Sequence, residues 1–179
     1  MLVGLLAILL AGCGGSGAGA PTTDQPTIVS LNPCTDAILA EVAAPDQLLA
    51  ISHYSHDPAA SSMDMAKAKR FRATGGTVEE VLALNPDIVV AGSFLPPATR
   101  AAFERLDIGV ETFGIASDVA ASKHQVREIA EIAGNSAAGH TLNDAIDAAL
   151  DAAQHDGEAM PALIWQSGGI VPGERTLIA

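Results

Sequence analysis

Two histidines three residues apart are the first candidates for chemistry in this sequence. His53 and His56 stand in the stretch SHYSHDP, with Tyr54 between them and Asp57 directly behind. Imidazole and carboxylate groups at this spacing could converge on a metal cation. A metal site needs three or four ligands, and the neighbouring sequence does not supply the others. The alternatives are hydrogen bonds from this loop to a large bound ligand, or solvated side chains without a role.

The elements that must position this loop follow a regular order. Short apolar runs alternate with helical segments from residue 27 onward, which predicts an α/β fold with a parallel sheet. Asn32 before Pro33 is typical of a helix start, and Thr77 with Glu80 forms a capping box. Strands are predicted at residues 28–31, 48–52, 87–91, 109–113 and 161–166. Helices are predicted at residues 33–43, 78–84, 97–106, 117–133 and 136–155 and from residue 174, with a loop at 53–73 and a turn at 167–173.

The strand ends indicate where a ligand would bind. In an open parallel sheet, ligands bind beyond the carboxyl ends of the strands. Free backbone N–H groups at the helix start near Pro33 would favour an anionic or polar ligand atom there. The residues that follow the first three strands of the lobe at this edge are therefore predicted to bind the ligand: Asn32, Pro33, Cys34, Thr35, His53, Tyr54, Ser55, His56, Ser93 and Phe94.

Cys34 carries a thiol, which can act as a nucleophile. A catalytic thiol needs a base within reach, and His53 is the one candidate that the predicted fold could bring near. Nothing else in the sequence is typical of a thiol enzyme. We therefore expect Cys34 to be a buried or cleft-lining small residue.

Charge and the first residues of the chain indicate the compartment. The 21 acidic residues outnumber the 9 Lys and Arg residues, which argues against a nucleic-acid partner. The apolar run at 2–11 is too short to span a bilayer and suits a signal peptide. It leads into Leu10-Ala11-Gly12-Cys13, which resembles the lipobox of bacterial lipoproteins. We predict a signal peptide at 1–13, lipidation of Cys13, a flexible tether at 14–26, and a location in the periplasm or cell envelope.

Four stretches together resemble one family of transport proteins. TGGTVEEVLALNPDIVVAG, IVSLNPCTDAILAEV, SHYSHDP and VREIAEIAG are similar to the substrate-binding proteins of ABC transporters for iron–siderophores and cobalamin. The resemblance implies two α/β lobes joined by a rigid helix, with the ligand in the cleft between them. It also implies docking on a membrane permease through acidic residues at the lobe tips. No acid stands near Thr99 and Arg100, where the first is expected, and Glu104 is the nearest substitute.

The resemblance also divides the chain into parts. Residues 27–133 correspond to an N-terminal α/β lobe, 134–157 to the connecting helix, and 158–179 to the start of a C-terminal lobe. An α/β lobe needs on the order of 100 residues. The second lobe is therefore expected to be truncated in this sequence. Trp165 and Gln166 end its first strand and are expected to face the cleft.

The predicted function is the capture of a metal chelate, an iron–siderophore or cobalamin, for an ABC permease. The protein is expected to be a monomer without enzymatic activity, cofactor or metal ion of its own. Arg72 could bind carboxylates of an iron chelate through bidentate hydrogen bonds, or belong to a solvated charged turn. Two rival classes stay open. One is a zinc- or manganese-binding protein of an ABC transporter, and the other is an enzyme subunit of the chelatase or nitrogenase architecture.

Overall fold

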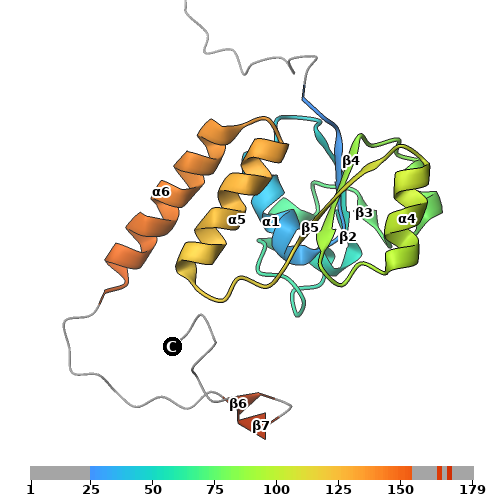
Figure 1. Ribbon diagram of the computed structural model, residues 1–179. Helices are drawn as coiled ribbons and strands as arrows, with labels where there is room; N and C mark the ends of the chain where they lie inside the picture. The colour runs from blue at the N-terminus through green and yellow to red at the C-terminus, as the bar shows by residue number, and fades with distance from the viewer. Residues whose placement is uncertain (1–24, 155–164, 167–168, 171–179) are drawn as a thin grey trace, which may run out of the picture.

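A parallel five-stranded sheet with the order β3-β2-β1-β4-β5 forms the centre of the fold (Figure 1). The computed structural model describes residues 25–154, 165–166 and 169–170. All four pairings in this sheet are parallel, as predicted. Because β1 lies in the middle, the chain turns back across it between β3 and β4. The strands are β1 (Ile28–Ser30), β2 (Leu48–Ser52), β3 (Ala73–Thr74), β4 (Ile88–Gly92) and β5 (Gly109–Phe113).

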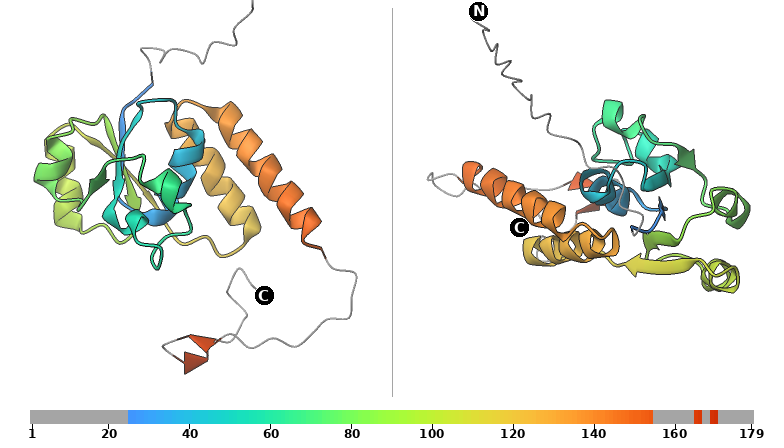
Figure 2. Two further views of the ribbon diagram at one scale, coloured as in Figure 1. Left: turned by 180° about the vertical axis from the view of Figure 1, so that it is seen from behind. Right: turned by 90° about the horizontal axis from the view of Figure 1, so that it is seen from above.

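Helices cover both faces of the sheet (Figures 1 and 2). One face carries α1 (Pro33–Val42), α5 (Val119–Ile132) and α6 (Ser136–Ala152), which contact one another. The other face carries α3 (Val78–Leu82) and α4 (Pro97–Arg105). A 3-10 helix, η1 (His53–His56), and the short helix α2 (Met65–Ala68) connect β2 to β3.

Two apolar layers separate the sheet from its helices. Side chains alternate between the faces of a strand, and the strands here are buried on both. Toward α1 and α5, Ile28 of β1 joins a cluster with Leu39 and Ile129. Toward α4, Val29 of the same strand joins a second cluster with Phe103. Each of these five side chains is completely buried, which is worth roughly 1.5–3 kcal/mol apiece.

Local signals in the sequence explain several element ends. The Asn32 side chain accepts a hydrogen bond from the Cys34 N–H at 2.9 Å, which confirms Asn32 as the N-cap of α1. The Thr77 hydroxyl caps α3 by accepting from the Glu80 N–H at 3.2 Å. Gly134 ends α5 with a φ of +67°, a conformation that glycine adopts at little cost.

Some sequence-based expectations were wrong in detail. The segment predicted as a loop at 53–73 contains η1, α2 and the first residue of β3. The helix predicted at 136–155 has an apolar stripe, Leu142, Ile146 and Leu150, that is only partly covered in α6, because Leu142 and Ile146 are half-buried while Leu150 is 43% exposed. In the stretch predicted as a strand and a turn, β6 (Trp165–Gln166) pairs antiparallel with β7 (Gly169–Ile170). The signal peptide at 1–13 with Cys13, nearly all of the tether at 14–26, and the helix from residue 174 lie outside the described residues.

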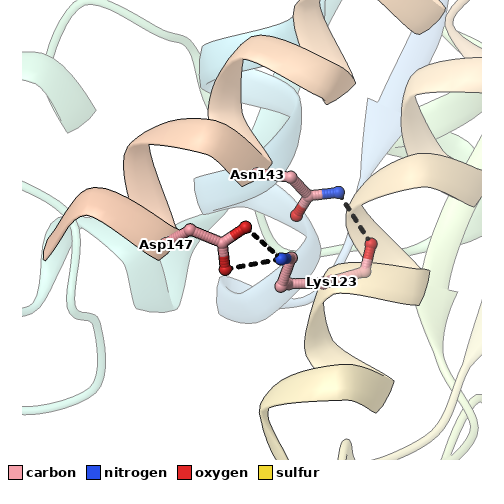
Figure 3. Close-up of polar contacts among 3 residues, drawn as sticks. All are labelled: Lys123, Asn143 and Asp147. Carbon is pink, nitrogen blue, oxygen red and sulfur yellow. Dashed lines mark hydrogen bonds and ion pairs between the residues drawn. The ribbon is translucent and has the colours of Figure 1, made fainter. Parts of the chain in front are cut away.

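Helix α6 is held against α5 by polar side chains and by close backbone contact. The Asn143 amide donates to the Lys123 carbonyl at 3.0 Å, and the Lys123 ammonium forms an ion pair with Asp147 (Figure 3). At the other end of the contact, Gly139 is buried against Ala130. Since α5 starts after the carboxyl end of β5, its antiparallel neighbour α6 runs back toward that edge of the sheet (Figure 1). Among the described residues, none of the helices combines the length and apolar character needed to cross a bilayer.

Substituting Gly139→Ala should weaken the contact between α5 and α6. A Cβ at residue 139 would lie 2.5 Å from the Ala130 Cβ, so the helices would have to separate. We expect the free energy of unfolding to fall by about 1–3 kcal/mol, measured by denaturant unfolding. Gly114→Ala is the matched control, because a Cβ there meets nothing within 4 Å. Equal stability of the two variants would contradict this account of the helix pair.

Candidate ligand-binding site

A cavity of about 230 Å³ opens at the carboxyl edge of the sheet. It lies at the ends of β1, β2, β3 and β4, beside the point where the chain crosses β1. This is the place where open α/β sheets bind ligands. Its described lining includes backbone and side chains of Gly, Leu, Ala, Pro, Asn, Ser, Thr, His, Tyr and Phe, and no Asp, Glu, Lys or Arg.

The cavity brings together part of the residue set predicted from the sequence. Asn32, His53, Tyr54 and Phe94 line it, joined by Ser52 at the end of β2. Other predicted residues lie near this edge but do not line the cavity. These are Pro33, Cys34, Thr35, Ser55, His56 and Ser93.

Two of the predicted residues, Cys34 and Arg72, have surroundings that differ from the expectation. Cys34 is an exposed free thiol that does not line this cavity, so a buried position for it was wrong, whereas its place on the wall of an inter-lobe cleft stays a prediction. Arg72 lies on two other hollows, one beside α1 and β2 and one beside α3. For Trp165 and Gln166 the structure describes only the backbone, as strand β6.

The two histidine rings bind backbone carbonyls on different elements. His53 Nδ1 lies 3.3 Å from the Thr74 carbonyl of β3, and His56 Nε2 lies 3.1 Å from the Ala68 carbonyl of α2. A carbonyl oxygen only accepts, so both of these nitrogens carry a hydrogen. One acceptor nitrogen remains on each neutral ring. Within the described part of the chain, no three His, Cys, Asp or Glu side chains come close enough together to bind a metal ion.

Two aromatic rings flank the end of β1 at the mouth of the cavity. Tyr54 follows β2 and is 55% exposed, while Phe94 follows β4 and is 76% exposed. The Tyr54 ring rests on the His53 ring, with 4.0 Å between ring centroids. Large apolar groups exposed beside a cavity are typical of a binding surface.

Sequence reasoning missed Gly92, which leaves room for the side-chain amide of Asn32. With Oδ1 of Asn32 committed to the cap of α1, its Nδ2 lies against β4. A Cβ on Gly92 would come within 2.8 Å of that Nδ2. Glycine at the end of β4 therefore keeps the Asn32 amide at the floor of the cavity.

A buried carboxyl group lies beneath the cavity, and sequence reasoning missed it as well. Oδ2 of Asp36 accepts from the Ser52 N–H at 3.0 Å and from the Ser55 hydroxyl at 2.6 Å. Burial raises the pKa of Asp36 to about 7, against smaller opposing effects of these hydrogen bonds. Asp36 shares the buried face of α1 with Leu39 and Val42, and this spacing was the available signal.

The comparison with known sequences decides the family. The sequence pattern of the family described as "Periplasmic binding protein" matches residues 28–179. The chain belongs to the periplasmic binding protein family. This confirms the predicted resemblance at the level of the family, and membership of the periplasmic binding proteins implies a periplasmic location. No curated protein sequence matches the chain significantly.

Solved structures of periplasmic binding proteins share the fold. The heme-binding protein BhuT, solved with two hemes, is 22% identical, with a TM-score of 0.57 over 71% of this chain and 48% of its own. The heme-binding protein HutB of Vibrio cholerae is 16% identical, with a TM-score of 0.61 over 79% and 56%. The vitamin B12 binding protein BtuF of Vibrio cholerae is 20% identical, with a TM-score of 0.55 over 70% and 48%. The chain thus spans about half the length of these periplasmic binding proteins.

The buried carboxyl should make stability depend on pH. The folded protein holds the Asp36 proton more tightly than the unfolded chain, where the pKa is 3.8. Its contribution to stability is therefore full below pH 3.8 and is lost as the pH rises through about 7. Asp36→Asn should remove this pH dependence, a difference on the order of 4 kcal/mol across that range.

Unfolding by denaturant at a series of pH values measures this difference. Asp87→Asn is the matched control, because hydrogen bonds from Thr27 lower the pKa of Asp87. Stability from Asp87 is present above its ordinary pKa of 3.8 and is lost as the pH falls through its lowered folded value. Parallel pH profiles of the wild type and Asp36→Asn would show that the Asp36 carboxyl has an ordinary pKa.

Proposed function

We propose that this chain forms one wall of the binding cleft of a solute-binding protein that delivers a metal chelate to an ABC importer. The observation that carries the proposal is the uncharged cavity at the carboxyl edge of the sheet, flanked by the rings of Tyr54 and Phe94. Family membership supports a binding role. Relatives of the same fold are described as binding heme and vitamin B12. The proposal includes no chemical step.

The lining of the cavity favours a metal macrocycle over an anionic siderophore. Two exposed aromatic rings offer flat apolar contact to a corrin or a porphyrin, worth roughly 0.5–1.5 kcal/mol per ring pair. A siderophore whose carboxylates or catecholates surround the metal would require cationic partners within this lining, whereas a porphyrin carries its carboxylates at one edge and can direct them away from the cavity. No Lys or Arg lies in the described lining. Arg72, the sequence-based candidate for that role, lies on other hollows.

The rest of the transport mechanism is part of the same proposal. A second lobe, beginning near Trp165 and Gln166, would provide the opposite wall, and closure of the two lobes on the ligand would be the state that the permease recognises. Helix α6 runs toward the carboxyl edge, which suits a connection to that lobe. Glu104 on α4 is exposed and pairs with Arg100 at 3.6 Å, and we keep it as the candidate for permease docking. The protein would act as a monomer.

Binding of three probes to the chain tests the proposed ligand class. Hemin, cyanocobalamin and a tris-catecholate ferric siderophore are titrated and followed by absorption and calorimetry. We expect at least one macrocycle to bind more tightly than the siderophore. Tyr54→Ala and Phe94→Ala should each weaken that binding about 5- to 10-fold, because each removes one ring contact.

Ile115→Ala is the matched control for the ring substitutions. Ile115 is 82% exposed and does not line the cavity, so binding should not change. Preference for the anionic siderophore would contradict the proposed ligand class. Tight binding of free zinc, abolished by joint substitution of His53 and His56 with Ala, would replace the proposal with a metal-ion binding protein.

We also propose that Cys13 carries a lipid anchor, because Leu10-Ala11-Gly12-Cys13 directly follows the apolar run of the signal peptide. Cys13→Ser should move the protein from the membrane fraction to the soluble periplasmic fraction. Mass spectrometry of the wild type should show more than one acyl chain, since a single chain anchors only weakly. Identical fractionation of the two proteins would contradict lipidation of Cys13. Cys34→Ser is the matched control, because Cys34 lies within the folded domain.

A further inference from the structure

On both sides of Tyr54, the turn that presents this residue to the cavity is hydrogen-bonded to the same oxygen atom of the buried Asp36 carboxyl. This turn, residues 52–56, consists of the last residue of β2 and the four residues of η1. Oδ2 of Asp36 accepts one hydrogen bond from each side of Tyr54, from the Ser52 N–H and from the Ser55 hydroxyl. Asp36, Ser52 and Ser55 are all buried, whereas Tyr54 between them is exposed. The backbone on both sides of Tyr54 is thus fixed to α1.

We propose that Asp36 is the positioning residue of the binding site, fixing the 52–56 turn so that Tyr54 and His53 stand at the cavity. The value of this position for a ligand rests on the proposed function, whereas the anchoring of the turn does not. Asp36 itself does not line the cavity, so it would act through the turn and not by contact with a ligand. The far end of the turn is also bonded to α2, through His56 Nε2 at 3.1 Å from the Ala68 carbonyl. The other two bonds at Tyr54 and His53 are longer. The Tyr54 N–H lies 3.3 Å from the Ser52 hydroxyl, and His53 Nδ1 lies 3.3 Å from the Thr74 carbonyl.

The surroundings of Asp36 favour a neutral carboxyl while the turn is closed. Oδ1 is buried and has no hydrogen-bond partner. An ionised group would leave charge on that oxygen without a donor, at a high cost in a buried position. The Ser30 hydroxyl of β1 faces the carboxyl, and it also lies 2.8 Å from the Thr35 hydroxyl. The Thr35 hydroxyl can donate to the Asn32 carbonyl at 3.0 Å and accept a hydrogen bond from the Ser30 hydroxyl. The Ser30 oxygen is then free to accept a hydrogen bond from the neutral Asp36 carboxyl.

The groups that face Asp36 from the neighbouring elements are all uncharged. They are the Ser30 hydroxyl of β1, the Ser52 N–H of β2, the Ser55 hydroxyl of η1 and the backbone at Asn32. The titratable rings of the turn are directed elsewhere, His53 to β3 and His56 to α2. The proton on Asp36 is therefore governed by burial beneath the turn and not by a charged partner.

The direction of the pH effect follows from linkage. Opening the turn would expose the carboxyl to water and return its pKa toward 3.8 from about 7. The closed turn thus binds the proton more tightly than the open turn, so acid favours the closed turn. As the pH rises through about 7, ionisation of Asp36 should loosen the turn and with it the position of Tyr54.

A single NMR signal can follow the turn, because Tyr54 is the only tyrosine in the sequence. The full chain is labelled with 13C in the tyrosine ring and carries His53→Gln and His56→Gln, so that no imidazole of the turn stands beside the ring. Glutamine amides retain donors for the Thr74 and Ala68 carbonyls. In the presence of Asp36 we expect the Tyr54 signal to move toward the free-tyrosine value as the pH rises through about 7. Asp36→Asn imitates the neutral acid and should keep the signal at the closed value throughout.

Asp36→Ala removes the anchor and should place the Tyr54 signal near the free-tyrosine value at every pH. If Asp36→Ala does not fold, the Tyr54 signal of Ser55→Ala tests the proposal instead, because this variant removes only the 2.6 Å hydrogen bond between Asp36 and the turn. A folded Asp36→Ala or Ser55→Ala protein with an unmoved Tyr54 signal would overturn the proposal. A pH-independent signal in the presence of Asp36 would overturn the linkage between its ionisation and the turn.

Hemin and cyanocobalamin affinities, measured without the histidine substitutions, connect the turn to binding. We expect Asp36→Ala to bind about 10-fold more weakly, whereas Asp36→Asn should match the wild type at pH 6 and lose less affinity at pH 8. Failure of the wild type to bind either probe, together with the expected Tyr54 signals, would reject the proposed function and leave Asp36 as the anchor of the turn. Binding that is insensitive to Asp36→Ala would reject Asp36 as a positioning residue of the site.

Discussion

The pairing of β1 with strands on both of its edges is the interaction on which the rest of the structure depends. β1 has only three residues, yet Ile28 pairs with Leu48 of β2 on one side and with Ile88 of β4 on the other. All three residues of β1, Ile28, Val29 and Ser30, are fully buried. This strand therefore joins the two halves of the sheet and supplies apolar groups to both layers. Every residue of the candidate site takes its position from the carboxyl end of β1 or from a strand near it.

The first turn of α1 connects that strand to the site. Its cap, Asn32, fixes where the helix starts, and the start of the helix fixes where the Asp36 carboxyl meets the chain leaving β2. The side chains at the sheet edge are thus arranged in two levels. Serine and threonine hydroxyls and the carboxyl are bonded to one another beneath the surface, while aromatic rings stand above them. A rigid polar level of this kind supports an apolar surface without being in contact with solvent.

Most of the fold could be predicted from the sequence because its signals are local. The strands predicted at 48–52 and 109–113 match β2 and β5 to the residue, and Asn32 with Pro33 indicated the start of α1. β3 could not be predicted, since it has two residues and is a strand only because Ala73 and Thr74 pair with Ile51 and Ser52. The extent to which the apolar side chains of α6 are buried could not be predicted either, because an apolar stripe in the sequence does not identify the elements that pack against it.

The candidate site was predictable in position but not in detail. The rule that ligands bind beyond the carboxyl ends of parallel strands identified Tyr54 and Phe94, because it requires only the order of strands and the residues that follow them. It could not separate residues that line the cavity from those directed into the core, such as Ser55. Asp36 escaped notice because an acid in the first turn of a helix is already favoured by the helix dipole. Its burial depends on residues 52 and 55, which come near only in the folded chain.

The cap of α1 has a consequence for the kind of selectivity that this wall can provide. The start of a helix attracts anions through its unpaired N–H groups, but here the Cys34 N–H is already bonded to the Asn32 side chain. Since the described cavity lining has no Asp, Glu, Lys or Arg either, the wall exerts little electrostatic pull at its surface. Discrimination between ligands would then depend on shape and on desolvation of flat surfaces. Affinity of that origin changes little with ionic strength, because there are few charges for dissolved salt to screen.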